Sequence, residues 1–490
     1  MKKIGFTLVE LLAVIAILAI LIIIALPNIL KLFNEAQMKI FLQEAKNINK
    51  AAEDSYLVQK MGTSSPLETT YTYVDGDETV TGNIKVSITG QKPRNGELLI
   101  TPNGETALAF HNGKYCAMKI LGSDEITISK VTPDQCILDF VTSEECFVID
   151  PDEVEYISQT YGVVEPFNYD YDYDSNEAVI YQYRYNNPNC SRNVVIPGTI
   201  DGKTVVAIES GAFASGNIGY YIEQNIDLAS VYIPSTVRFI GDRAFQNNSL
   251  KKVTIPNYVT YVGTSAFWNN QLTSLTLGNN LTSIGNEAFY SNQLKTVAIP
   301  NSVVTIGTSA FYDNQLTSLS LGNHVETIEW SAFGNNQLSS VTIPNSVETI
   351  GERAFAYNQL SSVTLGNNLV YIGYGAFETN ILANVVIPNS VTTIDDYAFY
   401  TNNITSLTLG NGVQYIGTGS FRENQLTTVT IPSSVTSIGN YAFYNGFTNN
   451  LLTSVFILGK SSSAGFSSYG SNIWGWAPGY SNSNITWNAP

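Results

Sequence analysis

The strongest pattern in the chain is a repeat of 22 residues in its C-terminal half. Ten phenylalanines recur at this interval without a slip, and Ile or Val stands five positions before each of them. A fixed period of this length is typical of a solenoid, in which each turn buries its apolar side only against neighbouring turns. The ten residues are Phe245, Phe267, Phe289, Phe311, Phe333, Phe355, Phe377, Phe399, Phe421 and Phe443.

Within one repeat, the apolar positions predict a short strand followed by a returning arc. Residues 272–278 read Leu-Thr-Ser-Leu-Thr-Leu-Gly, so Leu275 and Leu277 should point inward while Thr276 points outward. The strand should end at Gly278, or at proline in alternate turns, because proline cannot donate to a ladder. The arc is then expected to bury four apolar residues, Leu281, Ile284, Ala288 and Phe289.

Asparagine stands three residues after most of these phenylalanines, as at Asn270 and Asn292. A column of buried amides can satisfy the carbonyl and N–H groups that a tight turn leaves without partners. We therefore interpret Asn270 and Asn292, together with Phe245, Phe267 and Phe289, as structural residues.

The repeat unit I-P-N-S-V-x-x-I-G-x-x-A-F-x-x-N-x-L resembles the BspA-type, or Treponema-type, leucine-rich repeats of bacterial surface proteins. The resemblance covers about residue 190 to the C-terminus and implies a leucine-rich-repeat β solenoid with 22-residue turns, which we place at 191–459. We expect residues 460–490 to cap its open end. Trp474, Trp476 and Trp487 should serve that cap, with carbohydrate binding as the alternative.

The N-terminal segment has a different apolar pattern. Between Phe6 and Leu26 the only charged residue is Glu10, and the run is about long enough to span a bilayer. Helical spacing of apolar residues then continues, which predicts one long helix over 6–60. The change in character precedes the apolar run, at Gly5, whereas a secretory signal ends in a small-residue cleavage site.

The opening K-K-x-G-F-T-L-V-E-L-L closely resembles the signature of type IV prepilins, which pilins and pseudopilins share. The resemblance implies that residues 1–5 are a leader, that a prepilin peptidase cleaves after Gly5, and that Phe6 is then N-methylated. It also implies that Glu10 acts in pilus assembly by pairing with the N-terminus of a neighbouring subunit, because an unpaired carboxylate in hydrocarbon is costly. A plain uncleaved signal anchor is the alternative.

Between the helix and the repeats, short apolar strands alternate with Gly, Asn and Asp turns. The pattern predicts a small antiparallel β head over 61–142 that covers the helix, followed by an acidic β collar and solenoid N-cap over 143–190. The first 142 residues would thus form an α+β pilin-like module ahead of the solenoid. The predicted strands of the head are 71–74, 82–88, 97–100, 114–120 and 126–128.

Residues 169–174 alternate Tyr and Asp, which admits two interpretations. Alternating carboxylates suit calcium, but an EF-hand loop needs Gly and Glu where Ser175 and Tyr181 stand. The same alternation fits a strand that turns at Ser175-Asn176 into residues 178–181. We favour this hairpin and expect neither a metal nor a cofactor.

Four cysteines occur, all outside the repeats, and their spacing matches no zinc or redox motif. An even number favours disulfides in an oxidising compartment. We prefer sequential pairing among the three possible connectivities, namely Cys116 with Cys136 and Cys146 with Cys190; four reduced thiols are the alternative. The loop from Cys116 to Cys136 also resembles the disulfide-closed loop of many pilins.

Charge and histidine content narrow the function. A net charge of −17 is unsuited to nucleic acid, because phosphate contacts need Lys and Arg. The only two histidines, His111 and His324, stand near no recognisable nucleophile or metal set. We therefore expect no enzyme.

Outward strand positions of the repeats are mostly hydroxyls, which suits many weak and similar contacts with an extended partner. We expect a cell-surface adhesion protein, a minor pilin or pseudopilin whose solenoid lies outside the cytoplasm and binds an extracellular protein or glycan. A membrane-anchored receptor or scaffold that does not polymerise is the alternative. Tyr261, Tyr371 and Tyr415 are expected to add an aromatic patch on the arc. The binding-face candidates are Thr254, Thr276, Ser320, Thr342, Thr364, Thr408 and Thr430.

Overall fold

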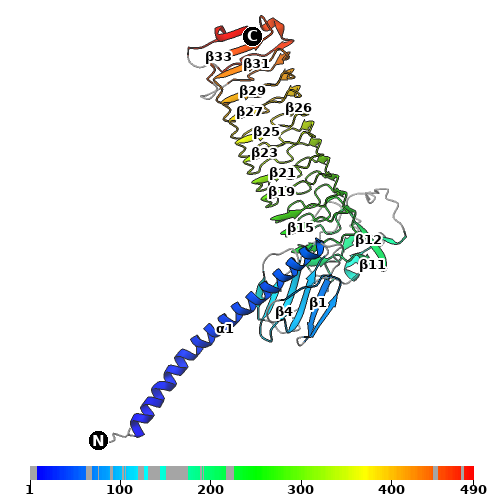
Figure 1. Ribbon diagram of the computed structural model, residues 1–490, viewed down its shortest axis with the longest axis vertical. Helices are drawn as coiled ribbons and strands as arrows, with labels where there is room; N and C mark the ends of the chain where they lie inside the picture. Colours follow the sequence, from blue (N-terminus) through cyan, green and yellow to red (C-terminus); the bar gives the residue numbers. More distant parts are fainter. Residues whose placement is uncertain are drawn as a thin grey trace. The chain divides into compact units, whose positions relative to one another are not determined.

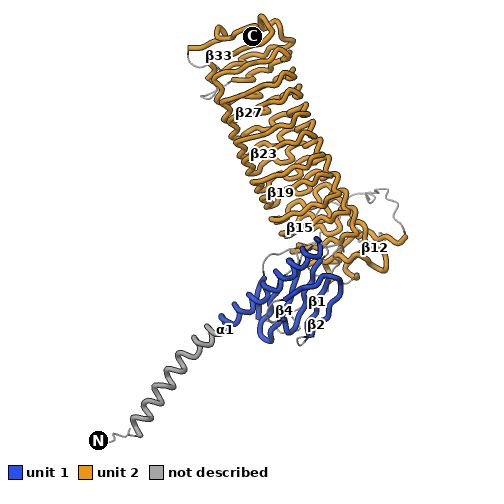
Figure 2. The backbone as a smooth tube through the Cα atoms, viewed as in Figure 1, with its two compact units in different colours: residues 1–139 blue, residues 140–490 orange. Residues whose placement is uncertain are grey.

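The chain forms two compact units, residues 1–139 and 140–490, which Figure 2 draws in separate colours. A computed structural model describes most of both units, and it describes the side chains of the N-terminal helix from residue 34 onward. The described residues are 8–61, 69–74, 77–88, 92–101, 104, 106–119, 126–130, 144–149, 175–187, 190, 192–216, 226–444, 451–475 and 479–489.

The first unit begins with one long helix, α1 (Leu8–Lys60). Its described part buries one stripe of side chains at helical spacing against a small sheet, because residues three and four apart share a helix face. The buried stripe consists of Phe41, Ala45, Ile48, Ala52 and Tyr56.

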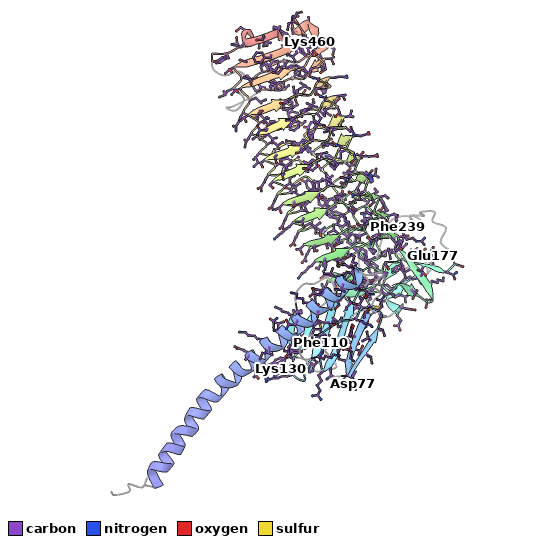
Figure 3. All side chains as sticks on the ribbon, in the orientation of Figure 1. Asp77, Phe110, Lys130, Glu177, Phe239 and Lys460 are labelled. Atoms are coloured by element: carbon purple, nitrogen blue, oxygen red, sulfur yellow. A yellow bond between two sulfur atoms is a disulfide. The ribbon has the colours of Figure 1, made fainter. Side chains whose placement is uncertain are left out.

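The sheet of the first unit is antiparallel, with strand order β2-β1-β3-β4-β5-β6 (Figure 1). Leu98, Leu108 and Phe110 of its central strands lie in the same core as the stripe of α1, and Figure 3 labels Phe110. The six strands are β1 (Thr69–Val74), β2 (Asp77–Thr81), β3 (Asn95–Ile100), β4 (Thr106–His111), β5 (Cys116–Lys119) and β6 (Thr127–Ser129).

The prediction of a strand over 82–88 is wrong, because this segment is irregular. The strand that pairs with β1 at this edge of the sheet is β2. Its backbone groups find side-chain partners on β1. The Tyr71 hydroxyl accepts from the N–H of Val86 and donates to the carbonyl of Ile84, both at 2.7 Å. Thr69 Oγ1 accepts from the N–H of Ile84 at 3.1 Å. These long-range contacts replace a ladder that the apolar alternation had suggested.

Each regular turn of the second unit contributes two strands, such as β17 (Ser274–Thr276) and β18 (Ser283–Ile284). We call them the first and second strand of a turn. Second strands pair in parallel with those of both neighbouring turns, 22 residues away, whereas most first strands pair in parallel with one neighbour; Figure 1 shows the stacked turns. The first strand is the one that the sequence predicted. The second lies in the expected arc and forms the longer sheet, which the sequence did not predict.

The second strands join into a 14-stranded sheet. Two of its strands, β8 and β11, flank β12 at the N-terminal end of the unit. Its members are β8 (Glu177–Ile180), β11 (Thr199–Ile200), β12 (Lys203–Ile208), β14 (Phe239–Ile240), β16 (Tyr261–Val262), β18, β20 (Thr305–Ile306), β22 (Thr327–Ile328), β24 (Thr349–Ile350), β26 (Tyr371–Ile372), β28 (Thr393–Ile394), β30 (Tyr415–Ile416), β32 (Ser437–Ile438) and β34 (Ser468–Tyr469).

The first strands pair in smaller groups. These are β10 (Asn193–Val195) with β13 (Ser230–Tyr232), β15 (Lys252–Thr254) with β17, β19 (Thr296–Ala298) with β21 (Ser318–Ser320), β23 (Ser340–Thr342) with β25 (Ser362–Thr364), β27 (Asn384–Val386) with β29 (Ser406–Thr408), and β31 (Thr428–Ile431) with β33 (Ser454–Leu458) and β35 (Ile485–Ala489). A separate pair joins β7 (Phe147–Val148) to β9 (Gln182–Tyr183), and short 3-10 helices lie at Glu144–Cys146, Ser463–Gly465 and Asn482–Asn484.

The repeated phenylalanines form one continuous stack inside the solenoid. From Phe213 to Phe443 every ring is fully buried. Successive ring centroids lie 5.0–5.5 Å apart, with interplanar angles of 2–13°. Each ring therefore packs on the rings of the turns before and after it. A single turn cannot bury its own ring, so it cannot fold alone.

Other aromatic rings close both ends of this stack. Tyr183 stacks on Phe213 at 5.2 Å, and Trp474 stacks on Phe443 at 5.3 Å. Trp487 of β35 packs against the same core, while Trp476 lies outside the described residues. Trp474 thus lies in the place of a phenylalanine of one further turn, and its burial removes the last ring face from water.

One asparagine side chain per turn forms hydrogen bonds to the irregular backbone of two adjacent turns. Asn270 Nδ2 donates to the carbonyls of Phe245 and Phe267 at 2.9 and 3.2 Å, and its Oδ1 accepts from the N–H of Leu250 at 3.2 Å. Asn292 repeats these contacts one turn on. Each amide satisfies groups of two turns, and leaving them unpaired in the interior would be costly. The same contacts recur through Asn424.

Candidate functional site

The outward residues of the first strands form a polar face that we call the hydroxyl face. Six of the seven predicted binding-face residues are exposed, and Thr254 is half-buried. They lie in one row, because Thr254 is in register with Thr276 and Thr342 with Thr364. Val386, 64% exposed, interrupts the row. The exposed six are Thr276, Ser320, Thr342, Thr364, Thr408 and Thr430.

A second surface lies between the second strand of one turn and the first strand of the next, as at residues 285–293; we call it the turn face. In the C-terminal turns it carries tyrosine rings and arginines that the sequence analysis missed. Arg353 lies 5.1 Å from the Tyr374 ring and 3.3 Å from the Glu378 carboxylate. The sequence signal was present, because Tyr397 and Tyr441 stand two repeats apart at one repeat position.

Two of the three tyrosines predicted to form a patch on the arc, Tyr371 and Tyr415, lie near the same two carboxylates, those of Asp395 and Asp396. Tyr371 donates its hydroxyl to Asp395, and Tyr415 donates to Asp396 at 3.3 Å. Burial, followed by the Asp395 carboxylate, raises the pKa of Tyr371, and burial and Asp396 raise the pKa of Tyr415. Both hydroxyls therefore stay protonated as donors. Tyr261 lies apart from them and stacks on Phe239 at 5.7 Å.

One disulfide lies at the N-terminal end of the solenoid. Cys146 and Cys190 are bonded, with 5.7 Å between their Cα atoms, as the preferred pairing predicted. The buried Cys146 precedes Phe147, whose ring centroid is 5.7 Å from that of Tyr183. Cys116 is also disulfide-bonded, and Cys136 lies outside the described residues.

Several predicted residues of the N-terminal module fall outside the description. Gly5 and Phe6 lie outside the described residues, and the side chain of Glu10 is not described. The same holds for residues 169–174; the turn at Ser175 leads directly into β8. Among residues described with their side chains, no helix is both long and apolar enough to cross a membrane.

No catalytic or metal centre emerges from the described residues. His111 is buried and accepts a hydrogen bond from the N–H of Gly113 at 2.9 Å. His324 is exposed, with Nδ1 2.8 Å from the carbonyl of Asn301. Over the described ranges, no group of three or more His, Cys, Asp or Glu side chains is placed to hold a metal ion.

Sequence comparison assigns the repeat. Residues 216–338 and 326–450 match the BspA type leucine rich repeat region. Residues 216–450 of the solenoid are BspA-type leucine-rich repeats. Residues 1–26 match the prokaryotic N-terminal methylation motif. The two resemblances seen in the sequence, to BspA-type repeats and to the prepilin N-terminus, are thus both supported. Neither match is to a catalytic family.

Three crystal structures are similar to the chain at low identity. A leucine-rich repeat protein from Bacteroides ovatus is 22% identical, with TM-score 0.40 over 66% of this chain and 99% of that one. The pneumococcal vaccine antigen PcpA is 21% identical, with TM-score 0.39 over 62% and 76%. A leucine rich cell surface protein from Faecalibacterium prausnitzii is 22% identical, with TM-score 0.36 over 64% and 91%. No curated protein matches the chain.

Proposed function

We propose that this chain is a cell-surface binding protein that presents its BspA-type solenoid from a pilin-like anchor, as a minor pilin or pseudopilin. The observation that carries the proposal is the union of an N-terminal methylation motif with a long repeat surface in one chain. A repeat surface of this kind presents many similar contact points, which suits avidity for a repetitive extracellular protein or glycan.

The first unit supports the pilin-like half of the proposal. Its described helix is held by a small antiparallel sheet, through an apolar stripe and through Thr106, whose hydroxyl donates to Asn49 of α1 at 2.6 Å. Other positions of α1 leave large apolar side chains exposed, at Ile40 (61%), Leu57 (55%) and Val58 (72%). Exposed apolar helix positions suit contact with neighbouring pilin or pseudopilin subunits.

The N-terminal segment supports export and anchoring. The apolar run from Phe6 to Leu26 fits insertion in the cell membrane, with Glu10 paired to the N-terminus of a neighbouring subunit. Prepilin peptidase would remove residues 1–5 and the new N-terminus would be methylated. The solenoid would then lie outside the cytoplasm, where the Cys146–Cys190 disulfide is stable.

The processing step gives a direct test in the producing bacterium. Mass spectrometry of the mature chain should find an N-terminal peptide that begins with N-methylated Phe6 and lacks residues 1–5. A peptide that still begins at Met1 would remove the pilin half of the proposal and leave the solenoid half standing.

A membrane-anchored receptor or scaffold that never polymerises is the second candidate, because the apolar run from Phe6 to Leu26 would anchor the chain without a neighbouring subunit. Glu10→Ala separates the two, since only subunit assembly needs the carboxylate. If the protein is a minor pilin, the variant should stay in the membrane fraction and fail to co-purify with major pilin subunits. Equal co-purification of variant and wild type would favour the receptor.

The hydroxyl face is our proposed contact surface for the protein or glycan partner. Thr342→Lys with Thr364→Lys should reduce adhesion of cells to a panel of matrix proteins and glycans, because two long charges interrupt the row of small hydroxyls. Thr327→Lys with Thr349→Lys makes the same change on the second-strand sheet and serves as control. Equal adhesion of both double variants would argue against the hydroxyl face.

A further inference from the structure

One column of the turn face alternates large residues with glycine. The position two residues before each repeated phenylalanine reads Arg353, Gly375, Tyr397, Gly419 and Tyr441 over five successive turns. All five have a left-handed backbone, with φ between 52° and 58°. A large planar side chain is therefore followed by a glycine one turn later, twice in succession.

The glycines are present for space and not for backbone freedom. Left-handed backbone favours glycine in general, but here Tyr397 and Tyr441 adopt it with φ of 58°. A Cβ on Gly419 would lie 2.8 Å from the Tyr397 ring, and one on Gly375 would lie 2.9 Å from Glu378 Oε2 and 3.2 Å from Arg353 Cγ. Each glycine thus leaves room for the preceding large side chain to lie along the turn face.

This spacing produces two equivalent tyrosine pairs. Tyr397 and Tyr400 meet edge to face at 5.6 Å and 80°, and Tyr441 and Tyr444 repeat the arrangement at 5.2 Å and 72°. Between the pairs, the Arg422 guanidinium lies 5.8–5.9 Å from the rings of Tyr400, Tyr441 and Tyr444. We call these five residues with Tyr374, whose ring is 5.6 Å from that of Tyr397, the aromatic strip.

The two pairs are spaced for a partner made of repeating units. They stand 44 residues apart, which is two turns, so equivalent rings should recur about 10 Å apart along the solenoid. All six residues of the strip are half-buried, so each ring is fixed by its neighbours yet still reaches solvent. A rigid ring that is already ordered loses little entropy on binding.

The polar groups around the rings can hydrogen-bond the hydroxyls of a ligand. The Glu378 carboxylate acts on Tyr374 and lies 3.3 Å from Arg353, and the Arg422 side chain, 30% exposed, lies 3.5 Å from Glu423. Ring faces bordered by acceptors and one guanidinium match a sugar, whose C–H face packs on a ring while its hydroxyls hydrogen-bond at the edge.

We infer that the aromatic strip is a binding site for a neutral glycan chain, with one tyrosine pair for each of two sugar subsites. The chain is neutral because the strip is bordered by carboxylates on a protein of net charge −17. The site is distinct from the hydroxyl face and does not depend on the pilin-like anchor. A protein partner, which tyrosine and arginine also favour, is the competing outcome.

The test uses the full-length chain in a detergent without a sugar headgroup. Titration calorimetry would measure binding of cellohexaose, xylohexaose, mannohexaose, maltohexaose and chitohexaose, each against its disaccharide. At least one hexasaccharide should bind and should do so more tightly than its disaccharide, because only the longer chain reaches both pairs. Tyr397→Ala with Tyr441→Ala should weaken that binding by about tenfold or more.

Two further variants keep the result interpretable. Tyr397→Phe with Tyr441→Phe keeps the rings and should bind within a few-fold of wild type. Tyr258→Ala with Tyr480→Ala removes two exposed tyrosines outside the strip, 63% and 43% exposed, and should leave binding unchanged. The inference is overturned if no hexasaccharide binds at millimolar concentration, if only acidic glycans or a protein bind, or if the alanine pair at 397 and 441 binds like wild type.

Discussion

The two units satisfy the backbone groups of their irregular segments in different ways. In the solenoid, one asparagine amide per turn bonds to equivalent backbone groups of two turns, and Asn336 bonds to Phe311, Phe333, Gly334 and Leu316. In the first unit, the Tyr71 hydroxyl bonds to the backbone of the segment 82–88, and this segment is not part of a repeat. A repeated solution can be seen in a sequence as a period, whereas a unique one has no period to reveal it.

The comparison predicts that the largest losses come from the repeated interior. Phe333→Ala should lower the stability of the solenoid by about 3–5 kcal/mol, because it removes a fully buried ring and leaves a cavity between two stacked neighbours. Hydrogen exchange on the full-length chain should show the loss in the turns around Phe311 and Phe355, with unit 1 unaffected. Phe456→Ala is the control, since that ring is 38% exposed on the outward side of β33. Equal effects of both changes would contradict the stack as the main support.

The amide ladder should rank second. Asn336→Ala should cost about 2–3 kcal/mol, because the N–H of Leu316 loses its partner and the carbonyls of Phe311, Phe333 and Gly334 each lose one of their donors. Local hydrogen exchange at Leu316 reports the loss directly. Asn368→Ala changes an exposed asparagine of a neighbouring loop and should stay within about 0.5 kcal/mol. A ladder variant as stable as this control would mean that water replaces the amide.

The corresponding change in the first unit should be smaller. Tyr71→Phe removes one hydroxyl and should cost about 1–2 kcal/mol, because the Ile84 carbonyl and the Val86 N–H lose that partner. Thermal unfolding and exchange at Val86 would measure it. Tyr73→Phe is a close control, because its buried hydroxyl faces Glu78 and bonds to no backbone group of the segment 82–88. A Tyr73→Phe loss as large as that of Tyr71→Phe would contradict the assigned role.

The smallest effect should be electrostatic and confined to one repeat position. Burial raises the pKa of Asp242, while the N–H of Thr264 and the charge of Arg243 act against it. Asn286 occupies the same position two turns on and accepts the equivalent hydrogen bond, from Thr308 at 2.9 Å. Asp242→Asn should therefore stabilise the solenoid by up to about 0.5 kcal/mol at neutral pH.

The stability difference between Asp242→Asn and wild type should depend on pH, with a sign that the raised pKa fixes. A raised pKa means that the folded state favours the protonated acid, so the penalty is present above the folded pKa and vanishes below about 3.9, the value of a free Asp. Unfolding measured against pH should thus bring Asp242→Asn and wild type together in acid. The reverse variant, Asn286→Asp, should lose stability as pH rises. A gap for Asp242→Asn that widens in acid would show that burial is not the cause.

Much of the solenoid follows from the sequence because its contacts are local. Each phenylalanine from Phe245 to Phe443 stacks on its counterparts one turn away, so the 22-residue period is enough to predict the stack. The first strands were equally readable, since Leu-Thr-Leu alternation shows which side faces inward. The second-strand sheet was missed because two residues per turn, such as Ser283 and Ile284, carry too short an alternation to indicate a strand.

The first unit was less readable for the opposite reason. β4 was not predicted, because its six residues are all buried and so show no alternation of apolar and polar positions. The segment 82–88 alternates as a strand should, yet Tyr71 and Thr69 hold it in an irregular form. Such outcomes depend on residues far away in the chain, which local patterns do not report.

By itself the sequence determined the period, the inward residues, the amide column and the N-terminal processing motif, because each depends on neighbours at a fixed spacing. Only the tertiary structure decided that Trp474, one of the three predicted capping tryptophans, is the ring that stacks on Phe443, and that Gly375 and Gly419 leave room for their neighbours. It also decided that tyrosines from separate turns meet as the aromatic strip. These features arise where side chains of different turns compete for the same space, and distances in space are what set the outcome.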